Sequence, residues 1–424
     1  MIARFGVVTG IVLKSALDAT SFAHAQSSTL LQCAGYRWTR PRLLVTDSVV
    51  QPAVARYPST VVTSKGTYVV GNNVPFFVED ALPRERLFAV ELGRGRIGRP
   101  AGDFLFVLPR ALAAPDGKLQ LLWAEPTIRS DATMTAMTWP PRELSAIWAS
   151  TYARGTGWSK PKRVYEGSRI HWDRAGIADG DASDSLPALV VAPEEPLANF
   201  GNTALLFLRS GRRGWTTTSV QPNSSIAYSS VARRGGRVWL AYIAADYGVP
   251  EDQNSVFVER SLDTGRHWLS PVLISRSGSN PAHDIKILAG RKDEVHAVWR
   301  REFSSGPRLQ HVSSHDGGVT WSTPDDIAIP SKSFGLKADI DKCGTIHVLY
   351  EDAHGGEIRI HIDHAAWNGG WTRVTHLFPH LRSNSPDFLV SSSGRAILTF
   401  LAQSASAPLA SPISSFFSEI MFRP

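Results

Sequence analysis

The chain has 424 residues, of which 43% are hydrophobic and 20% are charged. This balance is typical of a folded globular protein and excludes disorder over most of the length. The net charge of +7 is carried without a dense basic run, which argues against a nucleic-acid partner.

Residues 1–25 are predicted to be a signal peptide. Arg4 gives a positive start, residues 5–13 are mostly apolar, and Ala23 and Ala25 supply the small residues that precede a cleavage site. Residues 26–424 are then expected to form a single domain, secreted or periplasmic. No other stretch is long enough to span a bilayer.

A tryptophan followed by a polar pair, often with Pro, and then by aliphatic residues recurs along the chain. From Trp158 onward, successive copies lie about 50–57 residues apart, which is the length of a four-stranded sheet with its turns. The longer interval between Trp38 and Trp158 leaves room for one more copy, near residues 93–100, in which the Trp is missing. The copies begin at Trp38, Trp158, Trp215, Trp268, Trp321 and Trp371.

Each repeat also has an earlier half in which short runs of β-branched and aromatic residues are bounded by Gly, Asp, Asn and Pro. Such runs predict strands, and no segment shows a long helical period, so the expected fold class is all-β. Several second strands of these repeats end in an aromatic residue: 119–123, 238–242, 295–299, 346–350 and 396–400.

Two of the repeats share the pattern Ser-x-Asp-x-Gly-x-x-Trp. A short Asp can accept hydrogen bonds from nearby backbone N–H groups, Gly supplies a positive φ, and Trp covers the turn with an apolar face. These residue types build a tight hairpin and perform no chemistry on a substrate. The two copies use Ser261, Asp263, Gly265 and Trp268, and Ser314, Asp316, Gly318 and Trp321.

This pattern resembles the Asp-box or BNR repeat of the sialidase superfamily, and the resemblance implies a β-propeller of four-stranded blades. Seven blades are expected, or six if residues 58–100 are an irregular extension. Residues 36–44 are predicted to form an outer strand that no hairpin precedes, and the last repeat has no outer Trp strand of its own. We therefore expect this segment to pair with a strand near 416–421 and close the ring.

In a propeller the first strand of each blade starts at the face where the loops between second and third strands open. Candidate ligand residues therefore follow the aromatic ends of the second strands, and others lie in the long connection after Trp158. Carboxylates, Arg and aromatic rings facing a channel suit sugars. The candidates for ligand binding are Arg169, His171, Trp172, Asp173, Asp246, Arg300 and Arg301, and those for catalysis are Glu125, Tyr247, Glu302, Glu351 and Asp352.

The expected partner is a glycan or glycoconjugate, acidic ones included, and neither a metal nor a cofactor is expected. A sialidase would carry an Arg triad, a Tyr nucleophile with its Glu, an Asp acid/base, and an Arg-Ile-Pro signature on the first inner strand. Here Arg96 and Ile97 are followed by Gly98. The sequence favours a glycan-recognising propeller without a standard sialidase site. The alternatives are an exo-acting glycoside hydrolase with a diverged site and a protein-interaction propeller.

The only two cysteines, Cys33 and Cys343, are predicted to form a disulfide bond. Export makes the bond chemically possible. Cys33 lies just before the predicted closing strand, and Cys343 lies in the first hairpin turn of the preceding blade, so both are expected on the side of the Ser-x-Asp turns.

Overall fold

The computed structural model describes residues 36–44, 55–73, 86–102, 104, 106–114, 116–126, 144–167, 169–172, 175–178, 189–195, 204–211, 214–220, 225–245, 254–276, 280–330, 333–341, 343–354, 359–391, 395–404, 406 and 414–422. The predicted signal peptide lies outside this set. The chain divides into two compact units, residues 1–40 with 418–424, and residues 41–417. Among the described residues, no helix has the length and apolar character that crossing a membrane requires.

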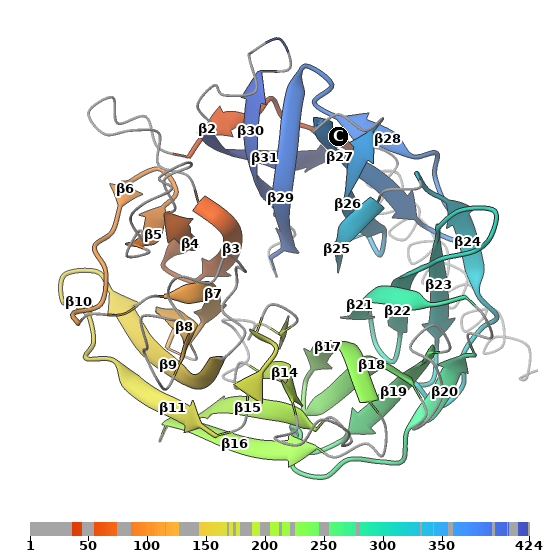
Figure 1. Cartoon of the computed structure of the whole chain (residues 1–424), viewed down its shortest axis with the longest axis horizontal. Coiled ribbons are helices and arrows are strands. Elements are labelled where there is room, and N and C mark those ends of the chain that lie inside the picture. Colours follow the sequence, from red (N-terminus) through yellow and green to blue (C-terminus); the bar gives the residue numbers. More distant parts are fainter. Residues whose placement is uncertain are drawn as a thin grey trace, which may run out of the picture. The chain divides into compact units, whose positions relative to one another are not determined.

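The larger unit is a β-propeller of seven sheets, which we number as blades 1 to 7. Figure 1 shows them around a centre, with the first strands innermost. Blade 1 contains β3 (Ala55–Thr63), β4 (Gly66–Asn73), β5 (Arg86–Glu91) and β6 (Gly95–Arg96). Blade 2 contains β7 (Val107–Ala113), β8 (Leu119–Pro126), β9 (Leu144–Ala153), β10 (Gly157–Trp158) and β11 (Lys162–Glu166). Blade 3 contains β12 (Arg169–Ile170), β13 (Gly176–Ala178), β14 (Leu189–Glu195), β15 (Leu205–Gly211) and β16 (Gly214–Val220).

The remaining blades follow the same antiparallel order. Blade 4 contains β17 (Ser225–Arg234), β18 (Arg237–Ala245), β19 (Asn254–Ser261) and β20 (Val272–Ser275). Blade 5 contains β21 (Ala282–Ala289), β22 (Val295–Arg301), β23 (Arg308–Ser314) and β24 (Asp325–Ala328). Blade 6 contains β25 (Ser333–Ile340), β26 (Ile346–His354), β27 (Arg359–Trp367) and β28 (Thr375–Leu377), and blade 7 contains β29 (Leu381–Val390), β30 (Ala396–Ser404), β31 (Ser414–Phe422) and β2 (Arg42–Leu43).

The predicted closure by the N-terminal segment is confirmed. In the larger unit, β2 pairs antiparallel with β31 through Arg42 opposite Phe417. In the smaller unit, β1 (Tyr36–Trp38) pairs with the last residues of β31, with Trp38 opposite Ile420. Because residues 58–100 supply blade 1, the expectation of seven blades is confirmed over six.

The core lies between neighbouring blades. The second strands are sandwiched between two sheets, so β22 is buried along nearly its whole length, whereas the outer strand β24 is mostly exposed. Trp239 of blade 4 packs in one cluster with Ile285 and Trp299 of blade 5. This explains why the second strands read as continuous apolar runs ending in an aromatic residue.

Candidate functional site

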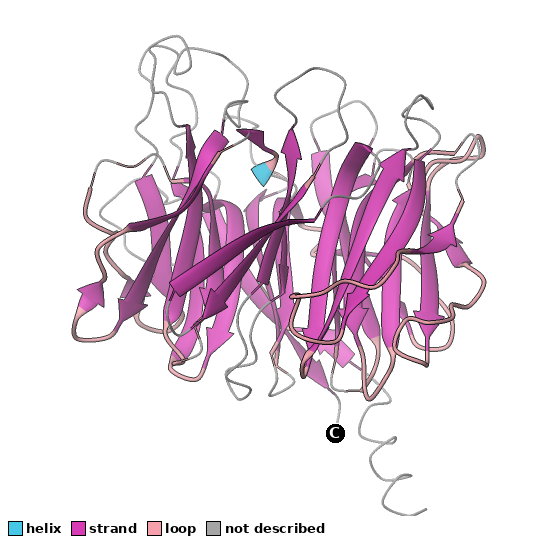
Figure 2. Ribbon diagram, turned by 90° about the horizontal axis from the view of Figure 1, so that it is seen from below, coloured by secondary structure: helices cyan, strands magenta, loops and turns pink. Residues whose placement is uncertain are grey.

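The two faces of the propeller carry different connections (Figure 2). First strands run from one face, called here the open face, to the other, called the turn face, where they are joined to the second strands. Both Ser-x-Asp turns lie on the turn face. The Thr264 N–H donates to the Gly236 carbonyl (2.8 Å), and the Gly317 N–H donates to the Asp293 carbonyl (2.8 Å). Both acceptors belong to first-to-second turns, as the sequence predicts for this face.

The turn after β19 is closed by its own side chains. The Ser261 hydroxyl donates to Asp263 Oδ1 (2.8 Å) and accepts the Gly265 N–H (2.8 Å). The backbone N–H of His267 donates to the same Asp263 oxygen (2.9 Å) and is the main reason that the pKa of Asp263 lies below its ordinary value. Gly265 has φ +82°, and a Cβ there would lie 2.5 Å from the Phe207 ring. Only glycine fits.

The turn after β23 repeats this arrangement. The Ser314 hydroxyl donates to Asp316 Oδ1 (2.8 Å) and accepts the Gly318 N–H (2.7 Å). The Thr320 hydroxyl donates to Asp316 Oδ2 (2.6 Å), which lowers the pKa of Asp316. Both carboxylates are thus used inside their own turns, and this is a structural role.

A cavity of about 970 Å³ occupies the centre of the ring. First strands of all seven blades line it, and it reaches the turn face at Gly235 and Ser391. The described residues of its lining include four more cations than carboxylates. The cations are Arg110, Arg233, Arg234, Arg237, Lys286, Lys292 and Lys337, and the carboxylates are Asp293, Asp339 and Asp387.

One layer of this channel is set by β-bulges. In blades 1, 2 and 4 to 7 the register between first and second strands shifts near the same level, and a channel-lining residue follows the shift. Bulges re-aim side chains and are frequent next to functional sites. The layer consists of Ser59, Arg110, Ser230, Lys286, Lys337 and Asp387.

Three members of this layer tie one blade to the next. Each side chain accepts a hydrogen bond from a backbone N–H in the neighbouring blade, and the donor is the residue directly after the equivalent layer position of that blade. These side-chain oxygens therefore already bond within the protein and help to join adjacent blades. The accepted donors are Ala111 for Ser59 (2.9 Å), Ile287 for Ser230 (3.2 Å) and Thr60 for Asp387 (2.6 Å).

The other three members are cations. Lys337 pairs with Asp387 (3.5 Å), and Arg110 donates to the Trp172 carbonyl (3.4 Å). The Lys286 ammonium forms no hydrogen bond or ion pair with a described residue, although the charges of Asp284 and Asp387 partly favour its protonated form. Burial in the channel, assisted by the charges of Lys337 and Arg110, lowers the pKa of Lys286 to about 8. This layer therefore offers an unpaired donor to an anion.

Asp339 lies two residues beyond Lys337 on β25. Its carboxylate accepts the N–H groups of Val390 (2.6 Å) and Ile340 (2.8 Å). Burial nevertheless raises the pKa of Asp339 to about 6, and the charge of Asp387 acts in the same direction.

On the open face, the structure brings together two of the predicted site residues. Arg300 Nη1 lies 2.5 Å from Glu302 Oε1, and its Nε lies 3.8 Å from Asp284 Oδ2. Asp284 sits at the bulge of β21 with φ +51°, a conformation that Asp tolerates better than most residues. The Arg300 charge is thus already neutralised by protein carboxylates.

The predicted ligand residue Arg301 points into the interior and is only 3% exposed. Its Nη1 donates to the Arg276 carbonyl (2.7 Å), whereas Nε and Nη2 have no hydrogen-bond partner among the residues that the structure describes. Burial lowers the pKa of Arg301 to about 10. A ligand would reach this guanidinium only after neighbouring groups moved.

In blade 6 the predicted residue Asp352 is buried beside Tyr350, and burial together with Asp363 and Asp352 raises the pKa of that phenol. The Asp363 carboxylate lies against the His376 ring nitrogen Nδ1. Glu351 is half-buried, and a Cβ on Gly335 would lie 3.2 Å from its Oε1. Glu351 therefore stays the more accessible of the two predicted acids.

Two predicted site residues are buried and form hydrogen bonds with the backbone. Trp172 is fully buried, and its indole N–H donates to the Leu108 carbonyl (2.9 Å). Glu125 is 1% exposed and accepts the Phe106 N–H (3.0 Å) at the bulge of β7. This burial favours packing and backbone roles over the predicted ligand contact and catalysis. Arg169 and His171 are half-buried and stay predictions, and Asp173, Asp246, Tyr247 and Cys33 lie outside the described residues.

Sequence reasoning missed the channel layer, although a signal was present. A proline in the middle of an inner strand marks a bulge because it cannot donate to the ladder. Three members of the layer directly follow such a proline, in Pro58-Ser59, Pro109-Arg110 and Pro386-Asp387. The lysines of blades 5 and 6 have no such mark.

No protein-family model and no curated protein matches the sequence. The fold itself is shared with solved structures. A protein of unknown function from Dyadobacter fermentans DSM 18053 has a TM-score of 0.53 at 13% identity, over 92% of this chain and 100% of that one. The polysaccharide lyase Uly1 has a TM-score of 0.53 at 11% identity, over 86% and 89%.

A third structure is an ulvan lyase of a new polysaccharide lyase family, bound to GlcA(1-4)Rha3S. Its TM-score is 0.52 at 12% identity, over 90% of this chain and 95% of that one. Likeness at these identities establishes the propeller fold, which agrees with the fold that the Ser-x-Asp turns predict.

Proposed function

We propose that this chain is an exported propeller that binds acidic glycans in its central channel. The observation that carries the proposal is the cation surplus of the described channel lining, in which the Lys286 ammonium forms no ion pair or hydrogen bond with a described residue and the charges of Lys337 and Arg110 act on it more strongly than those of Asp284 and Asp387. A carboxylate or sulfate ester among Arg110, Lys286 and Lys337 would supply that charge, and a guanidinium can hold either anion bidentately. A volume of about 970 Å³ is in the range of ligand sites.

The fold comparison supports the same ligand class. Two propellers with this fold are polysaccharide lyases, and one of them is bound to a disaccharide unit with a uronic acid and a sulfated sugar. The predicted signal peptide would bring this chain to the compartment where such polymers occur.

The test measures binding of purified protein to polygalacturonate and dextran sulfate, with neutral dextran as the ligand control. We expect Lys286→Met to lower affinity for the acidic polymers about tenfold or more, and Arg266→Met, an exposed turn-face Arg outside the channel, to change it little. Wild-type affinity should also fall as pH rises through about 8, where Lys286 loses its proton. Equal binding of neutral dextran, or equal losses in both variants, would contradict the proposal.

A hydrolase is the second candidate, favoured by the two neighbouring carboxylates of the channel. Asp339 has a raised pKa of about 6, whereas Asp387 lies against Lys337 and the Thr60 N–H. Unequal environments of this kind separate a proton donor from an ionised partner. Fluorogenic glycosides, sialic acid derivatives included, test it: hydrolysis abolished by both Asp339→Asn and Asp387→Asn would support this function, and no hydrolysis would reject it.

A further inference from the structure

The described channel lining contains three lysines, and their surroundings differ. Lys292 lies in the turn after β21 and is exposed. Lys337 is half-buried and pairs with Asp387 (3.5 Å). Lys286 is half-buried too, but its ammonium forms no ion pair or hydrogen bond with a described residue. Of the three, Lys286 is therefore the one whose nitrogen is both enclosed by the channel and free to react.

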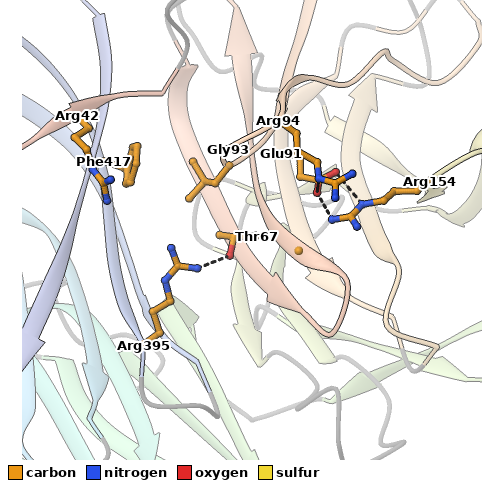
Figure 3. Close-up of a pocket in the computed structure, with 10 residues that line it drawn as sticks. Arg42, Thr67, Glu91, Gly93, Arg94, Arg154, Arg395 and Phe417 are labelled. Carbon is orange, nitrogen blue, oxygen red and sulfur yellow. Dashed lines mark hydrogen bonds and ion pairs between the residues drawn. The ribbon is translucent and has the colours of Figure 1, made fainter.

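Arginines cannot take this part, because a guanidinium stays protonated in proteins. The smaller cavity on the turn face, of about 350 Å³, shows the contrast (Figure 3). There Arg154 forms an ion pair with Glu91, and Arg395 donates to the Thr67 hydroxyl (3.4 Å). Both cavities are basic, yet only the channel has lysines in its described lining, so only the channel offers an amine nucleophile.

Charges from four strands act on the Lys286 amine. Burial lowers its pKa to about 8, and Lys337 of β25 and Arg110 of β7 act in the same direction. Asp284 of β21 and Asp387 of β29 each oppose this shift more weakly. About a tenth of the amine is then neutral at pH 7, against roughly one part in three thousand for a lysine of ordinary pKa. Desolvation and neighbouring cations are the conditions under which a lysine attacks carbonyl groups.

Lys337 adds a place for a carboxylate beside this amine. It occupies the equivalent layer position in the neighbouring blade. An ammonium has three N–H donors, and the contact with Asp387 is its one ion pair with a described residue. A ligand with a carbonyl group next to a carboxylate can therefore present the carbonyl carbon to Lys286 and the carboxylate to Lys337.

We propose that Lys286 is a covalent binding site for a small 2-oxo acid. The Lys286 nitrogen adds to the carbonyl carbon, and the electron pair of the C=O π bond moves to the oxygen, which takes one proton from the nitrogen. The nitrogen lone pair then forms the C=N bond while the hydroxyl leaves with the second N–H proton as water. Amine and oxo acid thus give an imine and one water, and nothing is oxidised or reduced.

Reductive trapping tests the site. Folded protein is incubated with pyruvate and cyanoborohydride, which reduces an imine to a stable secondary amine, and mass spectrometry of peptides locates the label. At pH 7 we expect the yield at Lys286 to exceed that at Lys292 about tenfold or more, and the preference to shrink toward pH 10, where lysines of ordinary pKa react as well. Protein unfolded in guanidinium chloride should show no preference.

Acetone, a ketone without a carboxylate, tests the role of Lys337. We expect Lys337→Met to lower the ratio of pyruvate to acetone labelling at Lys286 severalfold, and the control Lys292→Met to leave it unchanged. A shift in the pKa of Lys286 alone would change both labels equally, so the ratio isolates the carboxylate contact. Thermal unfolding shows whether each variant is folded, and Lys337→Gln replaces Lys337→Met if that variant is not.

The outcomes are distinct from those of the glycan proposal. Labelling of Lys286 no stronger than that of Lys292 overturns the covalent site, and this comparison needs only wild-type protein. A ratio that Lys337→Met leaves unchanged overturns the assignment to a 2-oxo acid. Failure to bind dextran sulfate would reject the glycan proposal alone, because polymer binding uses the Lys286 ammonium and weakens above about pH 8, whereas imine formation uses the neutral amine.

Discussion

At the scale of single residues, Lys286 is where charge and burial conflict most clearly. Its pKa falls from 10.5 to about 8 on folding. Between these pH values the unfolded chain holds a proton that the folded chain has released, so the free energy of unfolding rises with pH across this window. Below pH 8 the side chain is charged in both states, and the cost of its burial is fully present.

We therefore expect Lys286→Met to stabilise the ligand-free protein by about 1–2 kcal/mol at pH 7, because it removes an unpaired cation from the channel. The gain should shrink as pH rises from 8 toward 10.5. Urea unfolding of wild type and variant at pH 7 and pH 10 measures both effects. A variant less stable than wild type at pH 7 would show that the Lys286 ammonium has a partner in the folded protein.

At the scale of elements, the Ser-x-Asp turns are small self-contained units. Ser261 and Ser314 are almost fully buried, and each hydroxyl accepts a glycine N–H inside the turn. We expect Ser261→Ala and Ser314→Ala each to lower the free energy of unfolding by about 1–3 kcal/mol, since a buried donor loses its acceptor. Affinity for dextran sulfate should be unchanged in folded variant protein. A change of affinity at full stability would place these turns in the binding site.

The strands show where sequence reasoning succeeds and where it stops. Five second strands could be located from an aromatic residue, because that residue packs between two sheets, as Trp299 does, but each strand runs two to four residues beyond the predicted aromatic end. Three of the first-strand bulges are marked by a proline, but those of blades 4 to 6 carry no such mark, and there one extra residue reverses which side chains face the channel. Lys286 and Lys337 therefore read as ordinary strand residues, although they lie in one layer.

At the scale of the whole molecule, the repeat period predicts the ring, and the orphan strand at residues 36–44 predicts its closure. Both follow from local signals that recur. The channel layer has at most a proline as its local signal, because its residues come from different blades and meet only after the ring has closed. Arg110 and Lys337, for example, lie far apart in sequence and line the same channel.

The remaining prediction at this scale is the disulfide bond between Cys33 and Cys343. Cys343 is disulfide-bonded in the structure, and its pairing with Cys33, which lies outside the described residues, stays a prediction. Cys343 lies in the turn between β25 and β26, where its N–H donates to Asp341 Oδ1 (2.7 Å). A bond to Cys33 would close a loop of about 310 residues, for which chain entropy allows up to roughly 5 kcal/mol, although measured bonds often give less. We expect exported protein to contain the cross-linked peptide pair in a non-reduced digest examined by mass spectrometry. Reduction should then lower the unfolding temperature, whereas Cys343→Ala should show the lower value with or without reductant. Two free thiols in protein recovered from the exported fraction would reject the bond.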